Sequence, residues 1–301
     1  MYKYLFFDLD GTLINSYPRT LNAIKKIIKK HLGIDVPYEE LFIDAMVDLG
    51  HLFRKYGFPP SIFEELEEVF ASDSSLPKLE AFEGVKEVLE LAKEKGMICN
   101  IYTNRNELTH KFLKDAGIDT YFTSYLLEAN KPSSNSLIDF LVENKISPKD
   151  CLVIGDRLLD IEGAKGALVD AFAINDYKKE EGALFQGEGP SELMKFLNIN
   201  KIKNVYVCMR NDFSKNRMNR LFTLLQNKGI NSKYLKIKEF SYQEEDSILI
   251  SDTKEILDKG ASLNYITCGI NNTYSYNKAN IVIKEEIDLL TIINKLNSLG
   301  E

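Results

Sequence analysis

The stretch FFDLDGTL at residues 6–13 decides the fold of this chain of 301 residues. The run before it, residues 2–7, is apolar and aromatic with a single lysine, which is typical of a strand buried on both faces of a parallel sheet. Gly11 ends that strand. Along an extended backbone Asp8 and Asp10 share one face, and crowded carboxylates repel each other unless a cation lies between them. The motif therefore predicts a magnesium site at the end of a buried strand.

The rest of the first two thirds of the chain has two kinds of pattern. Apolar residues at helical spacing dominate to about residue 80, which predicts an all-helical insertion at about 16–80. From residue 83, strands and helices alternate: strands at 97–103 and 151–155, helices at 84–95, 106–116 and 133–144. This alternation predicts an α/β fold, a Rossmann-like parallel sheet with helices on both faces and ligands at the carboxyl ends of its strands.

Beyond residue 200 the strand and helix pattern starts again. The sequence ILISD at 248–252 is similar to LVIGD at 152–156, and a Lys-Gly-Ala sequence follows both. We therefore expect a catalytic core at 1–200 and a C-terminal α/β domain at 201–301. This domain is either a degenerate half-repeat of the core or a generic α/β appendage, and it has no second catalytic centre.

Charge and composition restrict the class of protein. The balance of 38 Lys and Arg against 45 Asp and Glu gives a net charge of −7, which favours neither nucleic acid nor an anionic membrane. Asp8 interrupts the N-terminal apolar run, and no later segment approaches a membrane span. The cysteines, which lack CxxC spacing, are expected to be reduced and buried in a cytoplasmic protein: Cys99, Cys151, Cys208 and Cys268.

Four short motifs occur in a fixed order along the chain. They are DLDGT at 8–12, YTNR at 102–105, KP at 131–132 and GDRLLD at 155–160. Each alone is explained by a turn, a helix cap or a helix start, but chance seldom produces all four in this order. The set resembles the haloacid dehalogenase superfamily, in particular its branch of phosphoglycolate phosphatases and β-phosphoglucomutases with a helical cap after the first motif. The second aspartate of DLD favours phosphoryl transfer over dehalogenation within that superfamily.

The resemblance implies a role for each motif residue. Asp8 would be the nucleophile that forms an aspartyl-phosphate, and Asp10 the general acid and then the general base. Thr103 and the Asn104 backbone would hold phosphate oxygens. Lys131 would neutralise charge on both the phosphate and the nucleophile.

The same resemblance implies a cofactor, Mg²⁺, and a substrate-reading cap. The ion would be held by the Asp8 carboxylate, the Asp10 backbone carbonyl and Asp156, with Asp160 in or near the outer shell. In the cap, the segment 49–54 lies where related caps present a substrate-reading loop. His51 and Arg54 are thus candidate contacts for the leaving group, and the alternative is that both lie on a solvated surface.

These expectations converge on one activity with two alternatives. The chain should be a magnesium-dependent phosphomonoester hydrolase that acts on a small phosphorylated metabolite through an aspartyl-phosphate. A sugar-phosphate phosphomutase shares every catalytic residue, and a non-catalytic binding or scaffold protein on the same core is the alternative of another class. Departures from the family pattern at Asn15 and at Ser133-Ser134 leave the substrate open. Homo-oligomerisation through the C-terminal domain is also left open.

Overall fold

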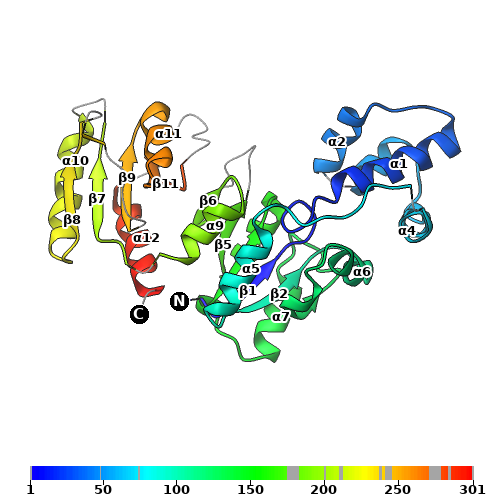
Figure 1. Ribbon diagram of the computed structural model, residues 1–301, viewed down its shortest axis with the longest axis horizontal. Helices are drawn as coiled ribbons and strands as arrows, with labels where there is room; N and C mark the ends of the chain where they lie inside the picture. The colour runs from blue at the N-terminus through cyan, green and yellow to red at the C-terminus, as the bar shows by residue number, and fades with distance from the viewer. Residues whose placement is uncertain are drawn as a thin grey trace. The chain divides into compact units, whose positions relative to one another are not determined.

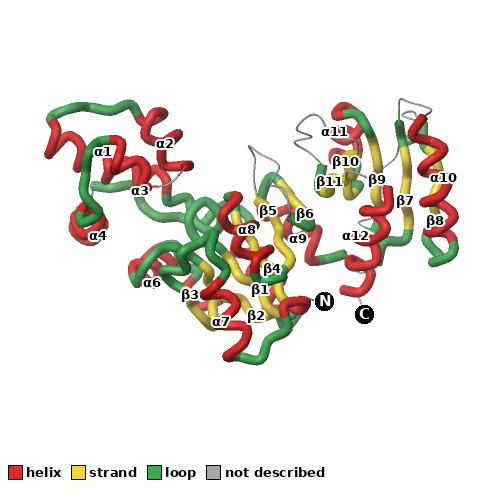
Figure 2. The backbone as a smooth tube through the Cα atoms, turned by 180° about the vertical axis from the view of Figure 1, so that it is seen from behind, coloured by secondary structure: helices red, strands yellow, loops and turns green. Residues whose placement is uncertain are grey.

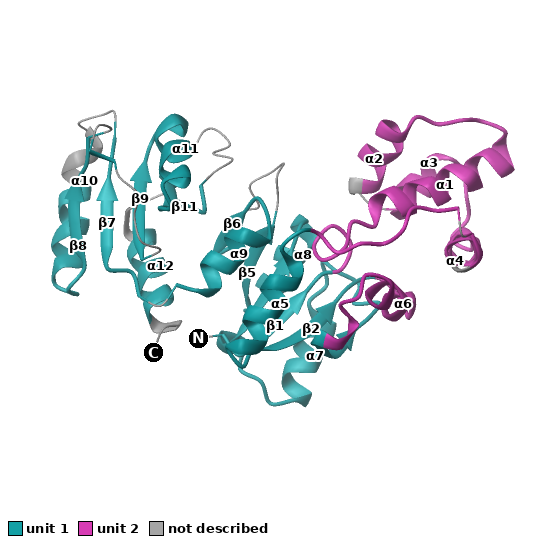
Figure 3. Cartoon of the chain, viewed as in Figure 1, with its two compact units in different colours: residues 1–8, 83–104, 121–301 teal, residues 9–82, 105–120 magenta. Residues whose placement is uncertain are grey.

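A computed structural model describes most of the chain and divides it into two compact units. The first unit comprises residues 1–8, 83–104 and 121–301, and the second comprises 9–82 and 105–120 (Figure 3). The described residues are 2–47, 49–73, 75–174, 183–199, 201–209, 213–236, 239–240, 246–270, 279–283 and 286–299. No helix in these ranges is both long and apolar enough to cross a membrane.

A six-stranded parallel sheet forms the core of the first unit, in the order β3-β2-β1-β4-β5-β6 (Figure 2). Its strands are β1 (Tyr4–Phe7), β2 (Ile98–Tyr102), β3 (Phe122–Leu126), β4 (Cys151–Gly155), β5 (Asp170–Ile174) and β6 (Phe185–Gly187). The chain extends from β1 first toward β3 and then, through β4, toward β6. The strand order therefore reverses beside β1, which is where α/β sheets bind ligands. This is the predicted α/β fold.

Helices cover both faces of this sheet. The helices α5 (Val85–Glu94) and α9 (Pro190–Leu197) lie on one face, and α7 (Asn135–Glu143) and α8 (Leu158–Gly166) on the other (Figures 1 and 2). The strand side chains alternate accordingly: Phe6 is fully buried and packs its ring at 5.7 Å, edge to face, against Phe140 of α7. Burial on both faces explains why the first strand is a continuous apolar run.

The second unit is helical. Its helices are α1 (Tyr17–Leu32), α2 (Tyr38–Val47), α3 (Leu49–Lys55), α4 (Ile62–Ser72) and α6 (Leu108–Asp115). Pro18 stands in the first turn of α1, and Gly33 ends that helix with φ of 72°, a conformation that favours glycine. The segment 49–54, expected as a loop, is helix α3; its side chains Leu52 and Phe53 are buried, which stabilises the helix against the rest of this unit.

A second parallel sheet follows residue 200, in the order β11-β10-β9-β7-β8. Its strands are β7 (Asn204–Val207), β8 (Asn231–Tyr234), β9 (Ser247–Ser251), β10 (Ile266–Ile270) and β11 (Ile281–Ile283), with helices α10 (Phe213–Gln226), α11 (Lys254–Ser262) and α12 (Glu286–Leu299) (Figure 2). The two sheets have the same strand order when β8, β7, β9, β10 and β11 are matched with β2, β1, β4, β5 and β6. The strand β3 has no counterpart in the second sheet. The similar sequences at 152–156 and 248–252 thus occupy matching strands, β4 and β9.

The two sheets belong to one compact unit and share polar contacts. The backbone nitrogen of Gln186 in β6 donates to the carbonyl of Asn280 at 2.9 Å, and the Asn280 amide donates back to the Gln186 carbonyl at 3.3 Å. Lys295 of α12 pairs with Asp170 of β5 at 2.7 Å. The predicted boundary near residue 200 lies between the last strand of the first sheet and the first strand of the second. That this boundary separates two domains stays a prediction.

Candidate active site

A buried charge cluster lies at the carboxyl end of β1. The Lys131 Nζ donates to Asp8 Oδ1 at 2.6 Å, to the Tyr102 carbonyl at 2.9 Å and to Asp160 Oδ1. Asp8 is 1% exposed, Lys131 5% and Asp160 0%. One cation thus lies between two buried carboxylates, an arrangement that needs both ion pairing and hydrogen bonding to be tolerated.

Lys131 is held in its charged form. Burial alone would lower its pKa, but the adjacent carboxylates of Asp160 and Asp8 more than offset that effect and raise the pKa above the ordinary lysine value. The ammonium group is therefore a fixed positive charge throughout the neutral range, beside the predicted nucleophile.

Strand register explains why these groups meet. Phe7 is paired with Ile101 of β2 on one side and with Ile154 of β4 on the other, so Asp8 follows at the level of Tyr102 and Gly155. The residues after these strands, Thr103 and Asp156, therefore lie at the same edge of the sheet as Asp8. Thr103 is 1% exposed and its backbone nitrogen donates to Leu126 of β3 at 3.0 Å.

Asn104 has a side-chain role that the sequence analysis did not predict. Its Oδ1 accepts from the Lys131 backbone nitrogen at 2.7 Å, and its Nδ2 donates to the Lys131 carbonyl at 3.1 Å. This paired exchange fixes the backbone of the segment that carries the lysine. The sequence contains both residues in its second and third motifs, and an amide side chain can both donate and accept. That the two residues bond to each other follows only from the folded structure.

Asp160 is positioned by the start of α8 and by a close approach to β4. Its Oδ2 accepts from the Arg157 backbone nitrogen at 3.1 Å, which caps the helix. A Cβ on Gly155 would lie 2.4 Å from the Asp160 Cβ, so only glycine leaves room for this carboxylate. The pairing of Asp160 with Lys131 places it in the centre of the cluster, nearer to the chemistry than an outer position alone would suggest.

The carboxylates fit a hard divalent cation. Asp8, Asp156 and Asp160 each offer an oxygen, and these oxygens lie within 4.8 Å of one another. Asp156 is only half-buried, which leaves this side of the cluster accessible. Oxygen donors of this kind suit Mg²⁺, which also retains several of its waters.

The remaining predicted site residues belong to the second unit. Asp10 forms a bidentate pair with Arg105: Nε donates to Oδ2 and an Nη donates to Oδ1, each at 2.9 Å. His51 and Arg54 are exposed on α3. Their predicted contact with a leaving group stays a prediction.

Residues 5–174, more than half of the chain, match the family model described as haloacid dehalogenase-like hydrolase. The chain belongs to this family. The resemblance carried by the four motifs is thereby confirmed, as is the expectation of an enzyme of the phosphatase type.

Among curated members of the family, a phosphoglycolate phosphatase from Aquifex aeolicus is 26% identical over 207 residues, covering 65% of this chain and 97% of that protein. A 5'-nucleotidase from Pseudomonas aeruginosa is 26% identical over 175 residues, covering 54% of this chain and 78% of that protein. A solved haloacid dehalogenase-like family hydrolase from Streptococcus pneumoniae aligns with a TM-score of 0.53 at 19% identity, over 65% of this chain and 99% of that chain. That structure shows the shared fold.

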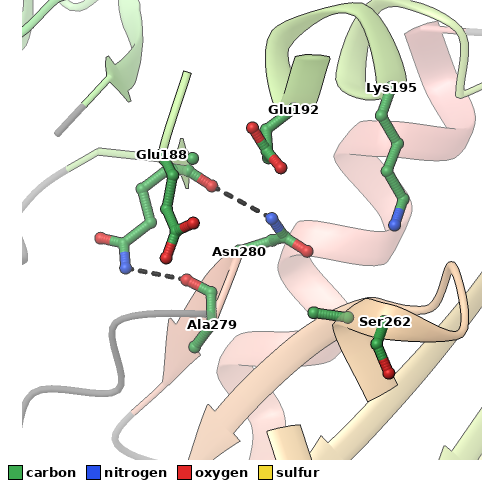
Figure 4. A pocket seen from close by; sticks show the side chains of 9 residues that line it. Glu188, Glu192, Lys195, Ser262, Ala279 and Asn280 are labelled. Atoms are coloured by element: carbon green, nitrogen blue, oxygen red, sulfur yellow. Dashed lines mark hydrogen bonds between the residues drawn. The ribbon is translucent and has the colours of Figure 1, made fainter. Parts of the chain in front are cut away.

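A separate pocket of about 190 Å³ lies where the two sheets of the first unit meet. Figure 4 shows Glu188, Glu192 and Lys195 around Asn280. The Gln186 Nε2 donates to the Ala279 carbonyl at 2.8 Å, and the Asn280 Nδ2 donates to the Gln186 carbonyl at 3.3 Å. The Lys195 Nζ donates to the Tyr265 carbonyl at 2.7 Å. None of the predicted site residues lines this pocket.

Proposed function

We propose that this chain is a magnesium-dependent phosphomonoester hydrolase that acts on a small phosphorylated metabolite through an aspartyl-phosphate on Asp8. The observation that carries the proposal is the buried cluster of Asp8, Lys131 and Asp160, with Asp156 beside it. Burying two carboxylates and an ammonium group is costly without a function, because hydrophobic residues of similar size would fold at least as well. The phosphoglycolate phosphatase and 5'-nucleotidase relatives support a small phosphate ester as substrate.

The reaction assigns a step to each side chain. A carboxylate oxygen of Asp8 attacks phosphorus, the bond to the ester oxygen breaks, and that oxygen leaves with its electron pair and takes a proton from Asp10. Water then attacks the phosphorus, Asp10 takes its proton, and the bond to Asp8 breaks with release of phosphate. Lys131 stabilises negative charge throughout, while Thr103 and the Asn104 backbone bind phosphate oxygens.

Mg²⁺ would be held by the Asp8 carboxylate, the Asp10 carbonyl and Asp156, with Asp160 beside it, and it would supply charge neutralisation between the nucleophile and the anionic phosphate. The chain's own cation cannot do this alone, because Lys131 already serves two carboxylates. Activity should therefore be lost on chelation and return with added magnesium.

The proposal assigns the chemistry to residues 1–200, in the cytoplasm, and no catalytic centre to 201–301. Cys208 follows β7 as Asp8 follows β1: its nitrogen donates to Ile250 at 2.9 Å, and the Asp8 nitrogen donates to Ile154 at 2.8 Å. A thiol thus stands at the place of the nucleophile, and burial together with the nearby Asp252 raises its pKa. Such a thiol is a poor nucleophile, which supports one catalytic centre per chain.

A screen of phosphorylated metabolites with and without Mg²⁺, scored for free phosphate and for isomerised product, tests the proposal. Asp8→Asn should lower turnover by at least ~10³ while the fold stays intact. Asp246→Asn, at the pair of Asp246 with the exposed Lys203, lies outside the charge cluster and is the matched control, which should leave turnover unchanged. Isomerised product in place of phosphate would indicate a phosphomutase. Near-normal magnesium-dependent activity of Asp8→Asn would refute the mechanism, and no turnover of any ester by the wild type would favour the scaffold alternative.

A further inference from the structure

Arg105 belongs to the YTNR motif, but the proposed mechanism gives it no role. Its guanidinium makes two parallel hydrogen bonds of 2.9 Å to the two carboxylate oxygens of Asp10, from Nε and from Nη2. This bidentate geometry fixes both the distance and the orientation of a carboxylate, which a lysine in its place would not do. Both partners belong to the second compact unit.

The guanidinium is itself held in place. It lies 4.4 Å from the ring centroid of Phe112 in α6 and 5.5 Å from that of Phe70 in α4. The two rings contact each other edge to face at 5.7 Å. The Arg105 side chain is only 12% exposed and that of Asp10 19%. Contact with two aromatic rings limits the movement of the guanidinium, so the direction of the Asp10 carboxylate is set by packing as well as by charge.

We propose that Arg105 is a positioning residue for Asp10, which it holds in the direction needed for proton transfer to the leaving oxygen. The inference rests on the proposed function of Asp10 as general acid and base. A protonated carboxyl oxygen is a donor, so at most one of the two bonds to Arg105 persists while Asp10 carries its proton. The other bond keeps the carboxyl group oriented while the bond between phosphorus and the ester oxygen breaks and that oxygen receives the proton.

The dependence of the rate on the leaving group separates this role from a purely structural one. An alkyl phosphate needs a proton on its poor leaving oxygen, whereas p-nitrophenyl phosphate loses a stable phenolate and needs little help. Misorienting the general acid should therefore slow the alkyl ester selectively. A general loosening of the fold should slow both esters alike.

The experiment compares kcat and KM of the full chain on glycerol phosphate and on p-nitrophenyl phosphate. Arg105→Ala should lower kcat on glycerol phosphate by at least ~10-fold more than on p-nitrophenyl phosphate, with KM changed by less than ~3-fold, because misplacing a reacting group by about 1 Å costs up to ~10² in rate. Arg105→Lys keeps the charge without the bidentate bond and should show an intermediate selective loss. If Arg105→Ala does not fold, Arg105→Lys decides the question.

Two further variants complete the design. Arg19 is the matched control, because it is an arginine of the same unit whose guanidinium donates to the carbonyls of Phe70 and Pro77, at 2.8 and 3.0 Å, and not to a carboxylate of the site. Arg19→Ala should show no selectivity between the two esters. In an Asp10→Ala background, Arg105→Ala should cause no further loss on glycerol phosphate, since the group that it positions is absent.

Equal losses on both esters, the same selectivity in Arg19→Ala, or a full additional loss in the Asp10→Ala background would each overturn the inference. These outcomes leave the proposed function standing as long as the wild type is active and Asp8→Asn is not. Absence of activity in the wild type would instead refute the proposed function itself.

Discussion

Replacing Lys131 by methionine tests the charge cluster most directly. Methionine keeps most of the side-chain volume and removes the ammonium group, which leaves Asp8 and Asp160 facing each other in a site where both are at most 1% exposed. Removal of one partner from a buried ion pair costs about 3–5 kcal/mol, because the remaining charge is uncompensated. We expect the metal-free variant to be destabilised by about this amount, with a loss of phosphatase activity.

The pH dependence of this effect follows from the raised pKa of Lys131. A group whose pKa is raised by folding contributes stability that is fully present below its unfolded pKa, about 10.4 for lysine, and that is lost as the pH rises through the folded value. The difference between the wild type and Lys131→Met should therefore be constant from pH 7 to pH 9. It should decline only at strongly alkaline pH.

The assay is urea unfolding in EDTA and in Mg²⁺. An ion at a concentration of about 100 times its Kd stabilises the folded state by about 2.7 kcal/mol. We expect Lys131→Met to bind Mg²⁺ more tightly than the wild type does, because no lysine then competes for the same carboxylates. Magnesium should thus raise the midpoint of Lys131→Met more than that of the wild type. Lys203→Met, at an exposed pair with Asp246, is the control and should shift stability by at most ~1 kcal/mol. A metal-free Lys131→Met as stable as the wild type would refute the reasoning.

Three other features can be tested separately. If His51 or Arg54 contacts the leaving group, alanine there should slow the natural substrate far more than p-nitrophenyl phosphate in steady-state assays; equal losses would place both on a solvated surface. Burial raises the pKa of Cys99 and Cys151 to about 12, so a thiol reagent at pH 8 should react with these cysteines only after denaturation, and rapid reaction of the native protein would contradict their burial. Asn280→Ala removes the acceptor that serves the Thr267 backbone and hydroxyl at 3.0 and 3.1 Å, and should cost about 1–3 kcal/mol in urea unfolding; an unchanged midpoint would show that water replaces it.

Much of the architecture could be predicted from local patterns. The strand at 151–155 is predicted with its observed bounds, because it is an apolar run of strand length with a turn signal beside it. Helix ends differ by one or two residues, as at α5 and α6, where terminal turns end the regular hydrogen bonding early. The prediction that the four cysteines are buried is also confirmed.

Two strands that no local pattern predicts depend on their neighbours in space. The strand β8 reads NSKY, which has no apolar alternation, and it forms only as the edge strand beside β7. The strand β3 reads FTSYL, which also lacks apolar alternation. Both strands are held by backbone hydrogen bonds to a neighbouring parallel strand, which their own sequences do not predict.

The candidate site shows the same limit. Motif order was enough to select Asp8, Thr103, Lys131 and Asp156, because strand ends in a parallel sheet converge. The side-chain bonds of Asn104 to the Lys131 backbone join residues 27 positions apart, and the pair of Arg105 with Asp10 joins residues 95 positions apart. No local pattern encodes such separations, so the groups that orient the chemistry are harder to find than the groups that perform it.

The absence of a side chain at Gly155 has a consequence for how variation in this family should be interpreted. A methyl group there would meet the Cβ, Cγ and Oδ2 of Asp160 at 2.4 to 2.5 Å. Alanine, ordinarily a mild replacement, would therefore displace a carboxylate that shares its cation with Asp8. In a library scored by growth or turnover, this position would tolerate as little change as the nucleophile. A shorter side chain at 160 would not rescue it, because the carboxylate itself would be lost. A position with no side chain is then constrained as tightly as the charged group that it makes room for.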